Sequence, residues 1–238
     1  MVTPPNRGDQ APSSVRRERR HVRGSQVKRS VIQRLTREYL LPHLPRFVAK
    51  GDMVYRIPVD DLLVSLLFES SSNDAASFAV RAFVQPLYVP SRHVQMTFGR
   101  RIRTHDRGEW WSYSSATEGD CFRLLQQEIA DQAMPILDRF REAADFVIHG
   151  RSLVSTHSNP IFLEAYAYSA CRAGMAADGL SALRALEVSL GEMDQTLAYV
   201  REMSDRAARL YAAESKDEVQ AQELLSEWRR VTIASLGI

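Results

Sequence analysis

The sequence predicts an α+β protein: an N-terminal helix, an antiparallel meander of about five strands, and a C-terminal helical bundle. Three observations support this. Apolar residues recur at helical spacing after residue 30, short β-branched and aromatic runs fill 52–114, and helical spacing then returns and continues to the end. With 238 residues, 45% of them apolar, the chain is long enough to bury a substantial core.

Residues 1–29 are expected to form a disordered basic tail, because they hold three prolines and almost no apolar residue that could anchor a helix or strand. Residues 1–30 carry eight basic side chains against two acidic ones, whereas the remainder carries 23 against 27. No long apolar run follows the basic residues, as a secretory signal would require, and the two cysteines cannot build a disulfide framework. We therefore expect a cytoplasmic protein that does not enter membranes.

Residues 30–117 are predicted to form a β-rich α+β lobe. A helix is expected from Val31 to Phe47 with Pro42 as a stop signal, followed by strands at about 52–58, 62–70, 77–88, 94–104 and 109–114. A polar turn at 70–74 makes the second and third strands a hairpin. The fourth strand is predicted to place one set of apolar residues on a single face: Val94, Met96, Phe98 and Ile102.

Residues 118–238 are predicted to form a helical lobe packed on the sheet. The first helix spans about 118–150 and must kink or restart near Met134, because Pro135 lies inside it; further helices follow at about 160–173, 176–190, 192–213 and 216–236. Asn159 and Pro160 supply an N-cap and a first-turn residue, and capping boxes are expected at Thr117 and Ser215. The pair of helices at 160–190 is similar to a tetratricopeptide hairpin, but no 34-residue period recurs.

The segment at 83–90, Phe-Val-Gln-Pro-Leu-Tyr-Val-Pro, is followed by Phe98-Gly99 and Trp110-Trp111. Together these motifs resemble bacterial α+β proteins that contain a domain of unknown function, over residues 30 to 148. The resemblance implies a bacterial cytosolic protein of this fold and assigns no activity.

The densest basic stretch of the folded body lies between Arg92 and Arg107, with five arginines and two histidines against one acidic residue. Trp110 and Trp111 cannot both point inward on a regular strand, so one of them is expected beside the arginines. Cations next to aromatic faces can bind single-stranded nucleic acid, although the same arginines could instead neutralise the acidic helical lobe. The predicted binding residues are Arg92, Arg100, Arg101, Arg103, His105, Arg107, Trp110 and Trp111.

No sequence motif identifies a reaction. The phosphate-binding glycine loops, the serine-hydrolase elbow and clustered metal ligands are all absent from the sequence, so we expect neither a cofactor nor a metal. The leading hypothesis is a non-catalytic bacterial binding or accessory protein that recognises another macromolecule, first of all a protein, in a defence, immunity or toxin–antitoxin setting. The alternative is a nucleic-acid-binding protein that uses the tail and the Arg92–Arg107 stretch. A second alternative is an enzyme that uses the His105–Cys121 region. The oligomeric state stays open.

Overall fold

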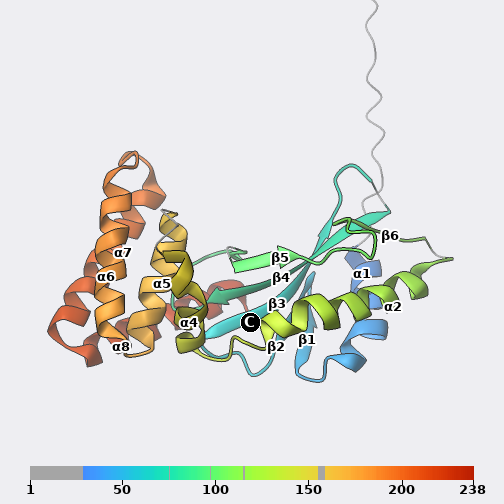
Figure 1. The fold of residues 1–238 in the computed structure, drawn as a ribbon, viewed down its shortest axis with the longest axis horizontal. Coiled ribbons are helices and arrows are strands. Elements are labelled where there is room, and N and C mark those ends of the chain that lie inside the picture. The colour runs from blue at the N-terminus through green and yellow to red at the C-terminus, as the bar shows by residue number, and fades with distance from the viewer. Residues whose placement is uncertain (1–28, 75, 97, 115, 155–158) are drawn as a thin grey trace, which may run out of the picture.

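A six-stranded antiparallel sheet with helices packed on it organises the chain (Figure 1). The computed structural model describes residues 29–238 except 75, 97, 115 and 155–158, so the predicted tail lies outside the described residues up to position 28. The predicted α+β class is confirmed, with a helix before the sheet and a helical region after it.

The sheet region begins with a short helical segment and continues as a meander. Its elements are α1 (Arg29–Leu35), the π-helical turn η1 (Thr36–Leu40), the 3₁₀ turn η2 (Leu41–His43), β1 (Phe47–Lys50), β2 (Met53–Arg56), β3 (Leu62–Ser70), β4 (Ser77–Pro86), β5 (Phe98–Arg101) and β6 (Trp111–Ser112). The strand order is β1-β2-β3-β4-β5, and β6 pairs with β4 beyond the end of β5. The predicted hairpin is β3 and β4, which pair from Leu62↔Pro86 to Ser70↔Phe78.

Two expectations about this region are wrong in detail. The first helical segment ends at His43 rather than Phe47, because Pro42 and Pro45 interrupt it, and Phe47 instead begins β1. The fourth predicted strand is only four residues long. Val94 and Met96 precede it and pack on the opposite side of the sheet from Phe98 and Ile102.

The two faces of the sheet are covered by different parts of the chain. The larger core joins one face to the helices and contains Phe68, Phe78 and Phe122 in close ring contact. The smaller cluster on the other face is built from Met53, Leu63, Phe83 and Leu87, and the C-terminal residues Ile233, Leu236 and Ile238 pack against it. Both faces therefore bury apolar side chains.

The helices after the sheet follow the predicted order with shifted ends. They are α2 (Glu118–Glu128), the π-helical turn η3 (Ile129–Ala133), α3 (Met134–Leu137), α4 (Ala143–Val154), α5 (Pro160–Arg172), α6 (Ala176–Gly191), α7 (Ala198–Lys216) and α8 (Glu218–Leu236). Pro135 lies in the first turn of α3, where its missing N–H costs least, and the π-helical turn η3 precedes it without a break in the helical backbone. The interruption instead falls after Leu137, where the connection 138–142 separates α3 from α4.

The caps at helix N-termini differ in how well they were predicted. The Asn159 side chain accepts a hydrogen bond from the backbone N–H of Ile161, as expected for the N-cap of α5. In contrast, Thr117 makes no side-chain cap to α2, and Asp217 rather than Ser215 caps α8.

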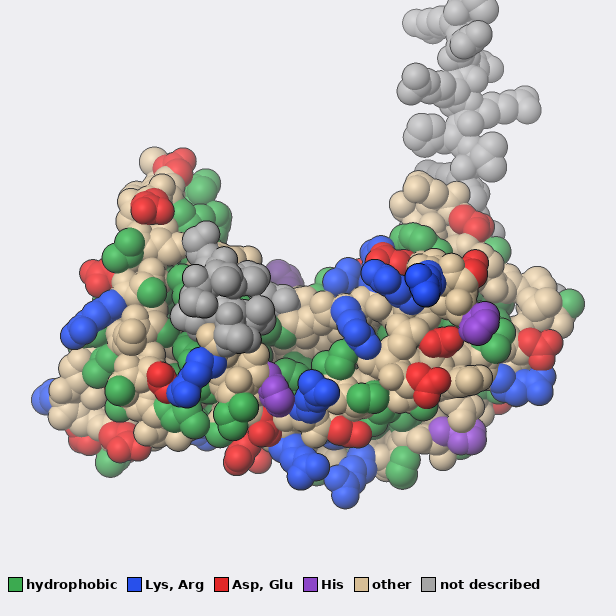
Figure 2. All heavy atoms as spheres, viewed as in Figure 1, with side chains coloured by type: hydrophobic (Ala, Val, Ile, Leu, Met, Phe, Trp, Pro, Cys, Tyr) green, Lys and Arg blue, Asp and Glu red, His purple; other side chains and the backbone are tan. Residues whose placement is uncertain are grey.

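Helix α8 connects the helical region to the sheet. Arg229 donates to the backbone carbonyl of Asp60 at 2.9 Å, and the Thr232 hydroxyl donates to the carbonyl of Val89 at 3.3 Å. Figure 1 shows α8 running from the helical end of the molecule toward the sheet, and Figure 2 shows a hollow between the two regions on the viewed face. This arrangement leaves the outer edge of β5 beside the hollow.

Candidate functional site

The predicted basic residues gather around β5, which lies at one edge of the sheet. Figure 2 shows Lys and Arg side chains over the rim where Figure 1 places this strand. Within the described part of the chain, β4 is the only strand that pairs with β5. One side of the β5 backbone is therefore free of a neighbouring strand.

The pairing register shows which backbone groups face outward. The N–H of Ile102 donates to the carbonyl of Val80 at 2.8 Å, so Ile102 and the residues two and four positions before it face β4. Gly99 and Arg101 alternate with them and direct their N–H and C=O groups away from the sheet. No described residue forms a hydrogen bond to these outward groups of Gly99 and Arg101.

The next outward-facing residue, Arg103, is paired by the Gln132 side chain. Its N–H donates to Oε1 of Gln132 at 3.0 Å, and Nε2 of Gln132 donates back to its carbonyl at 2.9 Å. Because the primary amide carries both a donor and an acceptor, it forms the two bonds that one residue of a neighbouring strand would form. The guanidinium of Arg100 also donates to the Gln132 carbonyl, which holds η3 against this edge.

Arg101 is held in place by acidic and aromatic neighbours. Its Nε lies 3.3 Å from Glu69 and its Nη1 lies 3.2 Å from Glu109, while Arg81 lies 3.5 Å from the same Glu69 carboxylate. Its Cζ lies 5.0 Å from the centroid of the Trp110 ring. Glu69 and Glu109 therefore compensate part of the predicted positive charge.

The two tryptophans separate as the alternation of a strand requires. Trp111 is buried and donates from its indole N–H to the carbonyl of Ile102, whereas Trp110 is 43% exposed. Trp110 therefore presents an aromatic surface beside Arg101 at the end of the loop that leaves β5.

That loop is a turn built on hydrogen bonds within 104–108. The N–H of Thr104 donates to the carbonyl of Gly108 at 2.7 Å, and Arg107 adopts a φ of 68°, a left-handed conformation. The Thr104 hydroxyl, followed by the Gly108 N–H, holds the pKa of the Asp106 carboxyl below its usual range. His105 is almost fully exposed, 4.0 Å from Glu128.

The remaining predicted arginines have no acidic partner among the described residues. Arg92, Arg100, Arg103 and Arg107 are all exposed. Arg92 lies apart from the strand, in the connection between β4 and β5.

The structure does not bring the candidate catalytic residues of the His105–Cys121 region together. Glu118 pairs with Arg34 at 2.9 Å, and Asp120 pairs with Arg123. Burial raises the pKa of the Cys121 thiol to about 11, so this thiol stays protonated at neutral pH and is a poor nucleophile.

Three contributors to this site were not predicted from the sequence: Glu69, Glu109 in its pairing role, and Gln132. Glu69 and Gln132 lie 32 and 29 residues from their partners Arg101 and Arg103. No local pattern marks such a pairing, because it depends on the strand register and on where η3 packs.

No group of three or more His, Cys, Asp or Glu side chains that could hold a metal ion is present among the residues described here. Of the helices in the described ranges, none combines the length and the apolar character that crossing a bilayer requires. Comparison with protein-family models, curated protein sequences and solved structures gave no match to the chain.

Proposed function

We propose that the protein is a binding protein that recruits an extended, acidic segment of another protein as an added strand on the outer edge of β5. The observation that carries the proposal is the pair of outward-facing backbone groups at Gly99 and Arg101, which continue into the Gln132-paired residue Arg103. Strand addition to an exposed sheet edge is a common mode of peptide recognition, in which main-chain hydrogen bonds supply much of the affinity.

The other edge of the sheet is less suited to this role. At β1, the N–H of Phe47 already donates to the carbonyl of Leu44 at 2.8 Å. Ile57 donates to the Arg46 carbonyl on the side that faces β2, which leaves Ala49 as the outward residue in the middle of the strand. The β5 edge offers two consecutive outward residues and a side-chain amide that extends their pattern.

The charges around β5 favour an acidic partner. Arg100, Arg103 and Arg107 are exposed and lack carboxylate partners in the described structure, so they can pair with acidic side chains of an added strand. Charged residues on a short edge strand also prevent self-association of sheets, and the experiment below separates this protective role from partner binding.

Nucleic-acid binding is the second candidate function, and the observation that favours it is the exposed Trp110 ring stacked with Arg101. Glu69 and Glu109 weigh against it, because they already compensate Arg101, the cation beside the exposed ring. A phosphate backbone would also leave the outward N–H and C=O groups of β5 without strand-like partners.

The test uses an acetylated peptide in which glutamate alternates with threonine, labelled for fluorescence anisotropy, and compares Arg101→Ala with Arg101→Pro. Both variants remove the guanidinium, but only proline removes the outward N–H, and an edge strand tolerates proline where the N–H faces solvent. We expect Arg101→Pro to bind the peptide roughly tenfold more weakly than Arg101→Ala. This factor corresponds to the loss of one backbone hydrogen bond at the upper end of the usual range of its free energy. Amide exchange at Gly99 should slow when the peptide is bound.

Two control ligands make the result decisive. A lysine–threonine peptide should not bind, and a single-stranded oligothymidine should bind far more weakly than the acidic peptide at about 50 mM salt. Equal affinity of the two Arg101 variants, or no binding of the acidic peptide to the unmodified protein, would overturn strand addition. Oligothymidine binding with a steep salt dependence would favour the second candidate function.

A further inference from the structure

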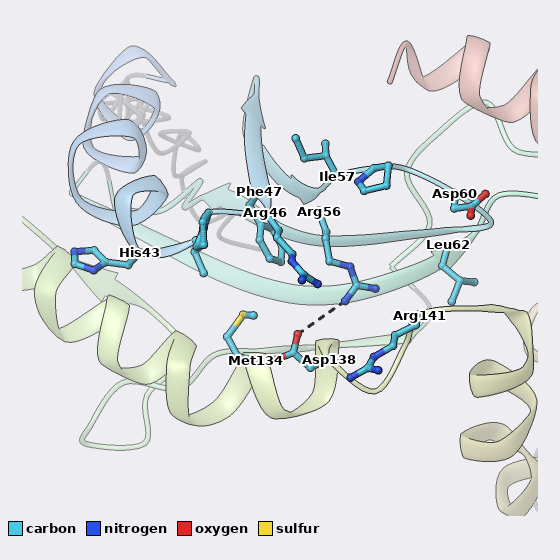
Figure 3. A pocket seen from close by; sticks show the side chains of 13 residues that line it. His43, Arg46, Phe47, Arg56, Ile57, Asp60, Leu62, Met134, Asp138 and Arg141 are labelled. Atoms are coloured by element: carbon cyan, nitrogen blue, oxygen red, sulfur yellow. Dashed lines mark ion pairs between the residues drawn. The ribbon is translucent and has the colours of Figure 1, made fainter.

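A cavity of about 600 Å³ lies away from β5, where β1 and β2 meet the connection between α3 and α4. Figure 3 shows Arg46 and Arg56 entering it from the strand side, while Arg141 enters from the helical side. Its volume lies within the range of about 300–1,000 Å³ that is usual for small-molecule sites. The cavity combines a basic mouth with an apolar floor, and the two features come from separate elements.

The apolar floor is formed by residues next to the sheet core. Leu44, Phe47 and Leu62 line the cavity and are buried, and Met134 from α3 contributes a partly buried thioether side chain. Such a floor can cover the apolar body of a ligand while the arginines contact its charged end.

Arg56 is the fixed member of the three arginines. Its side chain is only 18% exposed, and its guanidinium donates to the backbone carbonyls of Leu137 and Phe140 at the end of α3. These bonds fix the direction of the guanidinium plane and give a partner to the Phe140 carbonyl just beyond α3, while the Leu137 carbonyl also accepts from the Phe140 N–H. A guanidinium has five N–H groups, so further donors are available to a ligand.

Arg46 and Arg141 are the free members. Both are exposed, and neither side chain forms an ion pair or hydrogen bond with the residues that the structure describes. The nearest carboxylate to Arg56 is Asp138, whose Oδ1 lies 3.9 Å away and whose side chain is 59% exposed. The other acidic lining residue, Asp60, is paired with Arg229 at 3.2 Å. The cationic groups at the mouth therefore exceed the nearby acidic ones.

The three cations act on one another electrostatically. Burial is the main cause that lowers the pKa of Arg56; the Asp138 carboxylate, followed by that of Asp145, raises it, whereas repulsion from Arg141 and Arg46 lowers it. An anion placed among the three guanidiniums would convert this repulsion into attraction.

We propose that this cavity binds a phosphomonoester, with its phosphate among Arg46, Arg56 and Arg141 and its apolar body on Phe47 and Met134. Phosphate is favoured over carboxylate because a phosphate group is tetrahedral and doubly charged, so its oxygens can accept from guanidiniums that approach from two sides. A carboxylate is planar, and a single guanidinium can satisfy it. The site is separate from the β5 edge and does not depend on the function proposed for that edge.

Isothermal titration with phenyl phosphate at about 50 mM salt tests the proposal on the full chain. Arg46→Gln and Arg141→Gln should each weaken binding by roughly tenfold, the value of one charge-assisted hydrogen bond. Arg139→Gln is the matched control, because Arg139 is exposed in the same connection but does not line the cavity, and it should leave the affinity unchanged. Both test arginines are exposed without described partners, so all three variants should melt within about 2 °C of the unmodified protein.

Two further ligands define the class. Phenylacetate should bind at least tenfold more weakly than phenyl phosphate, and inorganic phosphate should also bind more weakly, because it lacks the ring that covers the floor. Met134→Ala should reduce the affinity for phenyl phosphate more than that for inorganic phosphate. The proposal is overturned if phenyl phosphate does not bind, if Arg139→Gln weakens binding as much as the other two variants, or if phenylacetate binds equally well.

Discussion

Replacing Arg206 with methionine should destabilise the protein, because it leaves a buried carboxylate without its cation. Glu164 on α5 is only 2% exposed, and Arg206 on α7 donates to its Oε1 from Nε at 3.0 Å and from Nη2 at 2.8 Å. Removing one partner of a buried ion pair costs about 3–5 kcal/mol, whereas an exposed pair contributes about 0–1 kcal/mol. Because the Arg206 side chain is 19% exposed, water can approach the vacated carboxylate, and we expect the lower end, about 3 kcal/mol.

The loss should depend on pH in a defined direction. Burial raises the pKa of Glu164 even though Arg206 opposes this, so removing Arg206 raises the pKa further. A carboxyl whose pKa is higher in the folded than in the unfolded state binds more protons when folded. Its contribution to the free energy of unfolding is therefore greatest below the unfolded pKa and falls as pH rises through the folded one. The deficit of Arg206→Met should shrink between pH 7 and pH 5.

Urea unfolding followed by circular dichroism at both pH values measures these differences. Glu164→Leu in the Arg206→Met background should recover most of the stability, because an uncharged pair of similar volume needs no desolvation. Arg230→Met, at an exposed position on α8, should change stability by less than about 0.5 kcal/mol. If Arg206→Met is no less stable than Arg230→Met at pH 7, or if its deficit is the same at pH 5, the reasoning about this pair is refuted.

Three further predictions concern stability. Gly99→Ala should lower the melting temperature by several degrees, because a Cβ there would lie 2.5 Å from the carbonyl oxygen of Ala82 and force β5 away from β4; an unchanged melting temperature would contradict this pairing. Glu214→Gln should raise the melting temperature at pH 7 but not at pH 4, since burial, followed by the charge of Glu218, raises the pKa of Glu214 and the carboxylate form opposes folding above that pKa. Equal effects at both pH values in calorimetry would argue against it. Deleting 233–238 should destabilise the protein and increase binding of a hydrophobic dye, because these residues cover the smaller apolar cluster of the sheet; unchanged dye fluorescence would show that this face needs no cover.

The long strands and helices could be predicted from the sequence, because each combines a long run of apolar residues at regular spacing with clear boundary residues. The strands β3 and β4 combine long apolar runs with a polar turn, and their predicted starts at 62 and 77 are confirmed. Helices α5 and α6 are bounded by Asn159 and Gly174, and Gly174 has the φ of 70° that its position predicts.

The short strands could not be predicted in the same way. Only Leu44, Pro45 and Arg46 lie between a helical segment and the four residues of β1, and so short a strand has too few alternating positions to be distinguished from a continuing helix. Before β5, Val94 and Met96 keep the alternation of a strand but leave the sheet plane to pack on Met53 and Phe83. A two-residue period shows that side chains alternate, but it does not show which apolar surface each set meets.

The candidate site also combines features that have a local sequence pattern with features that have none. The basic residues around β5 are visible in the sequence because they are adjacent, whereas an unpaired strand edge is a property of the sheet order and has no local pattern. The cavity likewise joins Arg46 and Arg56 with Arg141, which lies far from both in the chain and meets them only because α3 ends against β2. Sequence reasoning therefore identifies basic residues more readily than it identifies the acceptors and cavities that give them a role.

The position of helix α8 relates the covered faces of the sheet to its free edges. Its C-terminal residues cover the face of the sheet that α1 and α2 leave open, and Val94 and Met96 extend the same cover up to the start of β5. The main-chain groups left without partners in the described sheet lie at its edges, and part of the β1 edge is already occupied, because the Leu44 carbonyl just after η2 accepts from the Phe47 N–H. The β5 edge keeps two consecutive outward residues, Gly99 and Arg101, next to Arg103, whose N–H and C=O are already paired by the Gln132 side chain. A binding partner at this edge would extend a hydrogen-bond pattern that the protein has begun with its own side chain.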